Sequence, residues 1–352
     1  ELFRELVVQH SRSYVKQSIR QGDGKDILFP KPKEPKVVPY SVKQTYGKLL
    51  NMIEEAFDKE KPLFSLAVYY PYAYYKGDDK TIDPMDKGRQ KQVVSLIRTG
   101  FLKRFESSVE AFTSSCWTLL RKLLAWMELH VETDSEKGLL QRWKNQNSDL
   151  IGFMKDHQLD LWDEEGAAVE DDIIPERIYE SIDVLPRNDF KVDEIIQETL
   201  LDLNQLAHFL TYLENFKPSQ DKKLVALKNL LKGDPILSEH KVIIFTEFMD
   251  TARYLKKHLI ESKFSGVEEI DSARDVDRVD VIRRFSPYDN GSSSEELIKN
   301  NREEIRILIS TDVLSEGLNL QDCTRLINYD LHWNPVRLMQ RIGRVDRRMN
   351  AD

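Results

Sequence analysis

The hydrophobic positions in the middle of the chain follow helical spacing. From Val93 to Met127, apolar residues recur in steps of three or four, which keeps one apolar stripe on one face of a helix. The pattern predicts one long helix, or two helices with a break near Gly100. A similar repeat over residues 192–216 predicts a returning helix, and such lengths favour a projecting helical hairpin or coiled coil.

An extended segment separates two helical pieces near the start of the chain. Residues 29–35 contain three prolines, which exclude a helix because proline lacks a backbone N–H and restricts the residue before it. The second piece, from Ser41 to about Asp58, has apolar residues at helical spacing. We therefore interpret the proline segment as a strap between two helical pieces.

The pattern changes after about residue 217, where short apolar runs alternate with helical stretches. The runs are nearly continuous, as strands buried on both faces of a parallel sheet require. They cover residues 242–246, 305–309 and 326–329. Predicted helices cover residues 250–261, 275–285 and 335–348. This alternation predicts a doubly wound α/β domain with ligand sites beyond the carboxyl ends of its strands.

The composition describes a folded chain without a bulk attraction for nucleic acid. The 352 residues are 40% hydrophobic, enough for one sizeable core and a second element. The net charge is −8, so nucleic-acid binding must use a local basic patch. No apolar run reaches the roughly 18 residues of a membrane helix. Two distant cysteines favour a reducing compartment, so we expect a cytoplasmic protein without a membrane partner.

Two further features have competing interpretations. Residues 156–189 are strongly acidic, which is typical of a solvated loop or helix face; the alternative is a surface for a protein partner or for autoinhibition. The seven histidines show no metal-ligand spacing, so we predict no metal site in this chain. Because the chain begins without Met and ends in a charged segment, we expect a fragment of a longer protein.

Candidate chemistry gathers where the predicted strands end. Thr246 closes the first apolar run at a helix start, where a hydroxyl and free backbone N–H groups suit a phosphate oxygen. Its alternative role is a helix cap. After the second run, Thr311 is positioned to contact a phosphodiester. Gly317 allows close approach of the backbone, and Glu316 and Asn319 beside it are placed to face a bound nucleotide.

The last predicted helix concentrates arginines. Gln340, Arg344 and Arg347 lie at steps of four and three, so they share one face. It is energetically costly to place the charges of Arg341, Arg344 and Arg347 within two turns unless an anion neutralises them. A triphosphate held by another lobe fits, because an arginine finger stabilises charge on a transferred phosphoryl group. The alternative is a solvated helix whose arginines pair with Asp346.

In this order, the segments resemble the second RecA-like lobe of superfamily two helicases. Residues 243–246, 310–321 and 340–347 are similar to motifs IV, V and VI. Trp333-Asn-Pro335 and Ser315-Glu-Gly-Leu-Asn-Leu320 resemble the Swi/Snf-related branch, and residues 89–112 resemble a helical insertion of its bacterial members.

The resemblance implies an ATP-driven, nucleic-acid-stimulated translocase. Arg344 and Arg347 would act as fingers. Nucleotide contacts would come from Gln340, Arg341, Glu316, Gly317 and Asn319, and nucleic-acid contacts from Thr246, Thr311, Arg278 and Asn334. The expected substrate is double-stranded DNA, with RNA as the second choice.

The resemblance also implies that half of the ATP site lies elsewhere. In this family, ATP with Mg²⁺ lies between two lobes, and the first lobe supplies the phosphate-binding loop and the acidic pair. This chain has no Gly-x-x-x-x-Gly-Lys-Ser/Thr and no Asp-Glu-x-His. We therefore expect it to be inactive alone and to need the N-terminal RecA-like lobe of the same full-length protein.

The expected organisation has three parts: an inter-lobe strap with helices (1–60), a helical insertion with the acidic segment (61–218) and the RecA-like lobe (219–352). An alternative function is a protein-interaction scaffold that uses the lobe and the acidic insertion. The cluster of arginines argues against it, because a scaffold has no need of that charge. A nucleotide binder without motor activity is disfavoured by the lack of a Gly-rich strand-to-helix turn.

Overall fold

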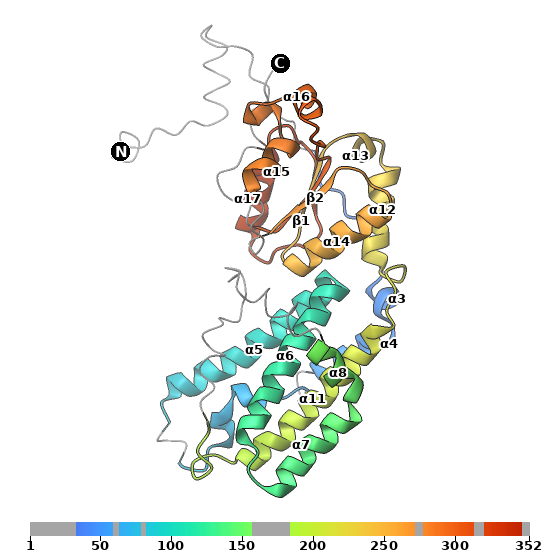
Figure 1. Ribbon diagram of the computed structural model, residues 1–352. Helices are drawn as coiled ribbons and strands as arrows, with labels where there is room; N and C mark the ends of the chain where they lie inside the picture. The colour runs from blue at the N-terminus through green and yellow to red at the C-terminus, as the bar shows by residue number, and fades with distance from the viewer. Residues whose placement is uncertain are drawn as a thin grey trace, which may run out of the picture.

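The protein, as a computed structural model, consists of a helical body and an α/β lobe (Figure 1). The described residues are 33–58, 63–78, 82–156, 184–271, 277–312 and 320–346. Most of the predicted acidic segment and the proline strap up to residue 32 lie outside these ranges. The chain enters the helical body first and then forms the lobe, so the two parts follow each other in sequence.

A four-stranded parallel sheet forms the centre of the α/β lobe. Its order is β2-β3-β1-β4, with β1 and β3 in the middle. The strands are β1 (Val242–Phe245), β2 (Val267–Ile270), β3 (Ile307–Ser310) and β4 (Leu326–Asn328). Three of them coincide with the predicted apolar runs, so the predicted α/β class with a parallel sheet is confirmed.

The central strand explains why these runs are apolar at every position. In β1, Val242 and Ile244 point to one hydrophobic core, and Ile243 and Phe245 point to a second core on the opposite face. Each such side chain gains about 1.5–3 kcal/mol by leaving water. Helices cover both faces: α12 (Lys222–Gly233) and α14 (Met249–Glu261) the first, and α15 (Arg278–Phe285) and α17 (Pro335–Val345) the second.

The strand β2 is absent from the predicted apolar runs. Glu268 and Glu269 interrupt its sequence, because β2 is an edge strand where a charged side chain can reach a partner outside the sheet. Lys256 of α14 forms an ion pair with Glu268. Shorter elements complete the lobe: α13 (Pro235–Glu239), η4 (Tyr288–Asn290) and α16 (Ser294–Lys299).

The long helical repeat breaks at Ser108, so the predicted break near Gly100 is wrong. Two helices, α5 (Pro84–Ser107) and α6 (Val109–His130), meet at this residue. Ser108 has an extended backbone, and its Oγ accepts a hydrogen bond from the backbone N–H of Ala111, as an N-cap does. Gly100 lies inside α5, where a buried helix tolerates the cost of about 1 kcal/mol of glycine.

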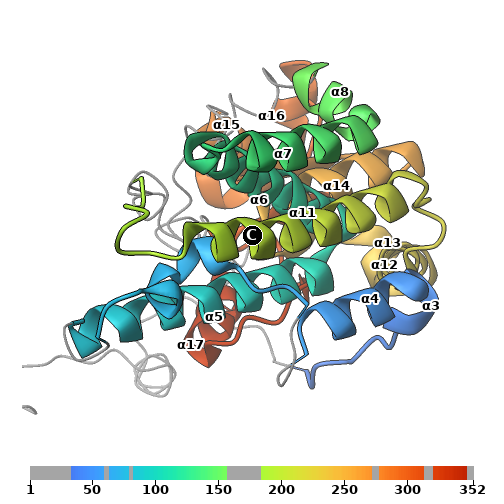
Figure 2. The same cartoon turned by 90° about the horizontal axis from the view of Figure 1, so that it is seen from below.

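The predicted return helix is α11 (Val192–Glu214), which packs against α6. The two helices do not form an isolated hairpin or coiled coil, because one core also takes in side chains of other helices. Figure 2 shows α11 crossing the body, with α7 on one side and α5 and α4 on the other. The remaining elements are α3 (Val42–Tyr46), α4 (Lys48–Ala56), η1 (Ala67–Tyr69), η2 (Pro71–Tyr74), α7 (Asp134–Gln146) and α8 (Ser148–Asp156).

A buried carboxylate fixes an irregular segment within the helical body. The two carboxylate oxygens of Asp202 accept hydrogen bonds from the backbone N–H groups of Ser65 and Leu66, each at 2.7 Å. Leu66 has a φ of 56°, a left-handed conformation that is costly for a leucine. Burial, with a smaller contribution from Glu198, raises the pKa of Asp202 to about 7, although the hydrogen bonds oppose the shift.

None of the described helices combines the length and the apolar character that crossing a bilayer requires.

Candidate functional site

Four polar residues meet at the carboxyl edge of the sheet. Thr246, Asp271, Thr311 and Asp330 follow β1, β2, β3 and β4, and all four are buried. Because the strands are parallel, their carboxyl ends share one edge. Thr246 and Thr311 therefore lie at the edge where the sequence pattern placed them, and their contacts with nucleic acid stay a prediction.

The carboxylate of Asp330 is the centre of a buried polar network. Its Oδ1 accepts from Lys223 Nζ at 2.7 Å. Its Oδ2 accepts from Thr246 Oγ1 at 2.5 Å, Ser107 Oγ at 2.7 Å and the backbone N–H of Glu247 at 3.1 Å. Burial alone raises the pKa of Asp330, but Lys223 and the donated hydrogen bonds outweigh it, so the pKa lies below its ordinary value.

The network occupies the hydroxyl of Thr246. This side chain is fully buried, and its Oγ1 donates to Asp330 while it accepts a long hydrogen bond from Phe248 N at 3.4 Å. A contact between this hydroxyl and a nucleic acid therefore requires the network to rearrange. The predicted nucleic-acid role of Thr246 stays a prediction.

Arg341 has an anionic partner within the chain. Its Nε and Nη2 donate to the two oxygens of Asp312 at 2.6 and 2.8 Å, and its Nη1 donates to the carbonyl of Asp330 at 3.0 Å. The guanidinium also lies 5.4 Å from the ring centre of Phe245. This two-point pairing fixes the plane and direction of a fully buried guanidinium. A direct contact between Arg341 and a nucleotide would have to compete with Asp312.

The helix α17 buries two arginines while it exposes three of its apolar side chains. Arg341 is fully buried and Arg344 nearly so, whereas Val336, Met339 and Ile342 are 54%, 71% and 48% exposed. This is the reverse of an ordinary surface helix. An exposed apolar face of this kind is typical of a surface that another domain covers.

The other predicted residues occupy different surroundings. Gln340 is exposed, although helical spacing puts it on the same face as the nearly buried Arg344. Asn334 is the N-cap of α17, where its Oδ1 accepts from Val336 N at 3.0 Å. Arg278 is exposed at the start of α15. Glu316, Gly317, Asn319 and Arg347 lie outside the described residues.

The hydroxyl of Thr311 differs from that of Thr246. Thr311 is buried beyond the end of β3, and its Oγ1 has no hydrogen-bond partner among the described residues. A buried hydroxyl usually has such a partner, because leaving it unsatisfied costs about 1–3 kcal/mol. This geometry is compatible with a ligand oxygen at Thr311, which is the predicted type of contact.

Three residues of the network were not among the sequence candidates: Ser107, Lys223 and Asp330. Asp330 carried a usable signal, because it directly follows a predicted strand and so belongs to the carboxyl edge. Ser107 carried none, since it is 223 positions away from Asp330 in the chain. Metal ligands also converge nowhere in the described ranges, where no group of three His, Cys, Asp or Glu side chains is arranged to hold an ion.

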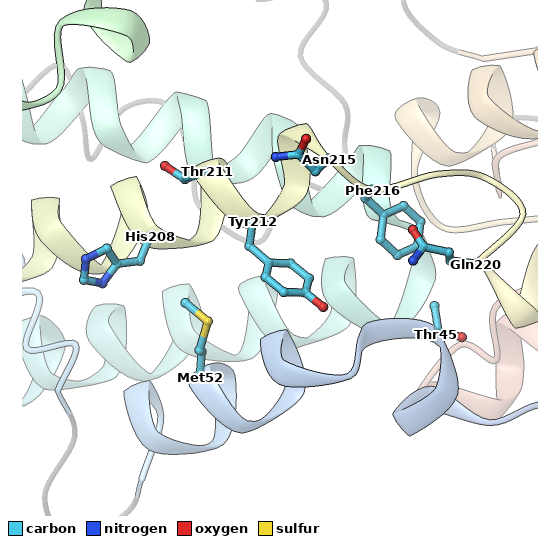
Figure 3. A pocket seen from close by; sticks show the side chains of 8 residues that line it. All are labelled: Thr45, Met52, His208, Thr211, Tyr212, Asn215, Phe216 and Gln220. Atoms are coloured by element: carbon cyan, nitrogen blue, oxygen red, sulfur yellow. The ribbon is translucent and has the colours of Figure 1, made fainter.

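A groove of about 600 Å³ lies beside α11 (Figure 3). It runs between α11 and the α3–α4 segment, and Tyr212 extends from α11 toward Met52 and Thr45 in the figure. The hydroxyl of Tyr212 donates to the carbonyl of Tyr46 at 3.1 Å. None of the predicted site residues lines this groove, so we do not assign it to the candidate site.

Comparison with known families places the carboxyl edge and α17 in one recognisable unit. Residues 222–349 match the family described as "Helicase conserved C-terminal domain". This part of the chain has the RecA-like fold of a helicase C-terminal lobe. The match includes all four strands, Asp330 and the arginine helix α17. It supports the predicted second lobe of a superfamily two helicase.

Relatives of the helicase C-terminal lobe occur in bacteria, archaea and eukaryotes. The chain is 36% identical over 132 residues to the "Uncharacterized ATP-dependent helicase YqhH" of Bacillus subtilis, covering 37% of this chain and 20% of that protein. It is 32% identical over 146 residues to a probable ATP-dependent RNA helicase of Methanocaldococcus jannaschii, covering 37% of this chain and 40% of that protein. The chain thus spans less than half of either relative.

Solved structures also align with the chain. The C-terminal part of the Fun30 ATPase domain covers 91% of this chain and 82% of that chain, with 18% identity and a TM-score of 0.36. The helicase domain of Pyrococcus furiosus Hef covers 88% of this chain and 50% of that chain, with 15% identity and a TM-score of 0.31. Because both TM-scores are below 0.5, no functional conclusion rests on these two likenesses.

Proposed function

We propose that this chain is the arginine-bearing half of a Swi/Snf-related, bacterial-type motor that uses ATP to translocate on double-stranded DNA. The observation that carries the proposal is α17 itself, which buries Arg341 and Arg344 and fixes Arg341 at the carboxyl edge of a helicase C-terminal lobe. Ligand sites of open α/β sheets lie at this edge. In this proposal the helical insertion comprises residues 61–218, the RecA-like lobe comprises residues 219–352, and the protein is cytoplasmic.

The exposed face of α17 supports a partner lobe. Val336, Met339 and Ile342 present an apolar surface on the same helix that turns its arginines inward. Covering this surface would remove apolar area from water, which stabilises association by about 25 cal/mol for each Å² buried. The partner in the proposal is the N-terminal RecA-like lobe of the same protein.

The residues of this chain fit one side of an ATP site. ATP with Mg²⁺ would supply the transferable phosphoryl group. Arg344 is assigned to its γ-phosphate, together with Arg347, and Gln340, Glu316, Gly317 and Asn319 to nucleotide contacts. The ligands of Mg²⁺ are assigned to the first lobe, because the family resemblance places the acidic pair there. The chain alone is then inactive.

The bidentate pair gives Arg341 a different place in the mechanism. Asp312 neutralises its charge and fixes its orientation, so Arg341 holds α17 against the residues that follow β3 and β4, and the contact to the γ-phosphate is assigned to Arg344. Positive charge preorganised at Arg344 would act mainly on the transition state. The nucleotide role predicted for Arg341 is therefore indirect in this proposal.

Duplex DNA is the proposed track because Trp333-Asn-Pro335 resembles the Swi/Snf-related branch. The relatives carry names of both kinds, helicase and RNA helicase, and do not distinguish DNA from RNA. Thr311, Arg278 and Asn334 are the proposed backbone contacts, and Thr246 joins them if the Asp330 network opens.

The test joins this chain to the first lobe of its full-length protein and measures ATP hydrolysis without nucleic acid, with duplex DNA and with single-stranded RNA. We expect duplex DNA to stimulate hydrolysis most strongly and the 352-residue chain alone to stay at background. Stronger stimulation by RNA would contradict the choice of track.

Two outcomes would overturn more than the track. If the folded joined protein hydrolyses no ATP with any nucleic acid, the motor assignment is wrong and the scaffold alternative gains support. If the purified chain hydrolyses ATP alone, the half-site argument is wrong.

A further inference from the structure

The corner between α5 and α6 lies directly on the carboxyl edge of the helicase C-terminal lobe. We define this corner as residues 103–108. Lys223 of α12 donates from its Nζ to the carbonyl oxygens of Glu106 at 3.0 Å and Ser107 at 3.1 Å, and also to Asp330. One ammonium group thus satisfies the end of α5 and the buried carboxylate of the lobe.

Hydroxyl groups bind the corner to the start of α14. Ser107 Oγ and Ser108 Oγ each lie 2.7 Å from Thr251 Oγ1, and Ser107 Oγ also donates to Asp330. All four residues are buried. At the rim of the corner, Lys103 pairs with Glu247 at 3.5 Å and lies 5.4 Å from the ring centre of Trp333. The corner is therefore fixed by directional contacts and not by apolar packing alone.

A series of hydrogen bonds connects the helical body to α17 through Asp330. Ser107 holds the carboxylate of Asp330, and the carbonyl of Asp330 accepts from Nη1 of Arg341 at 3.0 Å. Asp330 also lies between β4 and α17 in the chain, so its position sets where the approach to α17 begins. A shift of the corner would move Asp330 and, with it, one of the acceptors that hold Arg341.

We propose that Ser107 is a positioning residue, through which the helical body controls the placement of Asp330 and of the arginine helix α17. In its effect on turnover, the inference rests on the proposed function. The physical coupling does not, since it can be measured in this chain by itself. Ser107 touches neither nucleotide nor nucleic acid in this account, and its effect on α17 passes through Asp330.

The first experiment measures amide hydrogen exchange of the chain alone. Ser107→Ala removes one donor to Asp330, and we expect exchange to become roughly 5- to 30-fold faster in the segment 328–345, the range that follows from losing one buried hydrogen bond. Exchange in α11 should stay unchanged. The matched control is Ser115→Ala, another buried serine of the helical body, whose hydroxyl donates only to the carbonyl of Ala111.

Two results of the exchange experiment decide whether the coupling exists. Faster exchange in 328–345 for Ser107→Ala but not for Ser115→Ala supports the coupling. Equal exchange in that segment for the two variants overturns it. Thr251→Val provides a second variant of nearly unchanged shape, and we expect it to act on the same segment less strongly because it leaves the bond between Ser107 and Asp330 in place.

The second experiment uses the chain joined to its first lobe. We expect Ser107→Ala to lower kcat about tenfold with KM for ATP unchanged. Displaced arginines lose contacts that are made mainly in the transition state, and the loss of such contacts lowers kcat. A rise in KM at constant kcat, or no change in either, would overturn the control of turnover. If the unsubstituted joined protein shows no ATP hydrolysis, the proposed function fails, while the exchange experiment still decides the coupling.

Discussion

The helical body and the helicase C-terminal lobe bury their polar groups in different places. In the helical body, Asp202 and the pair of Glu136 and Arg187 fix loops to neighbouring helices. In the lobe, two buried ion pairs lie at one edge of the sheet: Arg341 with Asp312, and Lys223 with Asp330. The comparison teaches that buried charges in the body fix loops to the helices around them. Buried charges in the lobe are concentrated at the edge where sheets of this kind bind their ligands.

The largest effect is expected for Arg341→Leu. This change leaves Asp312 buried without its partner, which costs about 3–5 kcal/mol and should unfold the lobe at a lower denaturant concentration. Urea unfolding followed by circular dichroism measures it. The control is Arg302→Ala, which removes an exposed pair with Asp280 and should cost less than about 1 kcal/mol.

A double variant sharpens this prediction. Arg341→Leu combined with Asp312→Leu removes both charges, so much of the lost stability should return. If the single Arg341→Leu variant is as stable as Arg302→Ala, the buried pair does not hold the edge in the way the geometry implies.

An intermediate effect is expected at Asp202 in the helical body. Its folded-state pKa of about 7 lies above its ordinary value of 3.8, so the folded state binds the proton more tightly. Its contribution to stability is therefore fully present below about pH 4 and is lost as the pH rises through about 7. Asp202→Asn should abolish this dependence and cost about 1–3 kcal/mol at low pH through a lost hydrogen bond.

Urea unfolding between pH 4 and pH 8 measures the effect, with the exposed Asp193→Asn on the same helix as control. If the stability of the unsubstituted chain and the stability of Asp202→Asn depend on pH equally, the titration of Asp202 does not contribute to stability.

The smallest effect is expected at Glu136. Burial raises its pKa, but hydrogen bonds from Arg187 and from two backbone N–H groups outweigh burial and lower the pKa to about 2. Its contribution is therefore present above about pH 4.5 and lost as the pH falls through about 2. Glu136→Gln should cost about 1 kcal/mol at pH 7, because the pair is only partly shielded from water.

Thermal unfolding at pH 7 and at pH 2 measures this difference, which should shrink to a small fraction of its size at pH 2. A difference that persists there would assign the effect to packing and not to charge.

The sequence predicted the parts of the fold that depend on repeating patterns. Continuous apolar runs located β1, β3 and β4, since strands with two cores need apolar side chains at every position. The edge strand β2 was not predicted, because it contains Glu268, whose cationic partner lies on a neighbouring helix. The break at Ser108 escaped because a capping serine leaves no mark on apolar spacing.

The site was predictable only where chain order determines position. Thr246 and Thr311 follow strands and therefore had to reach the carboxyl edge. The partner of Arg341 was less evident, because an arginine cluster that needs an anion is satisfied equally by a bound phosphate or by Asp312. The contact between Ser107 and Asp330 joins distant parts of the chain, and no local pattern encodes it.

The most direct test of the central claim is turnover of the joined protein with Arg344→Ala. An arginine finger contributes about 10³ to 10⁵ in kcat, so we predict a loss of at least about 10³-fold with DNA affinity within a few-fold. Arg302→Ala, an exposed arginine of the same lobe, is the matched control and should keep full activity. Unchanged turnover for Arg344→Ala would contradict the claim that this chain supplies the arginine half of the ATP site.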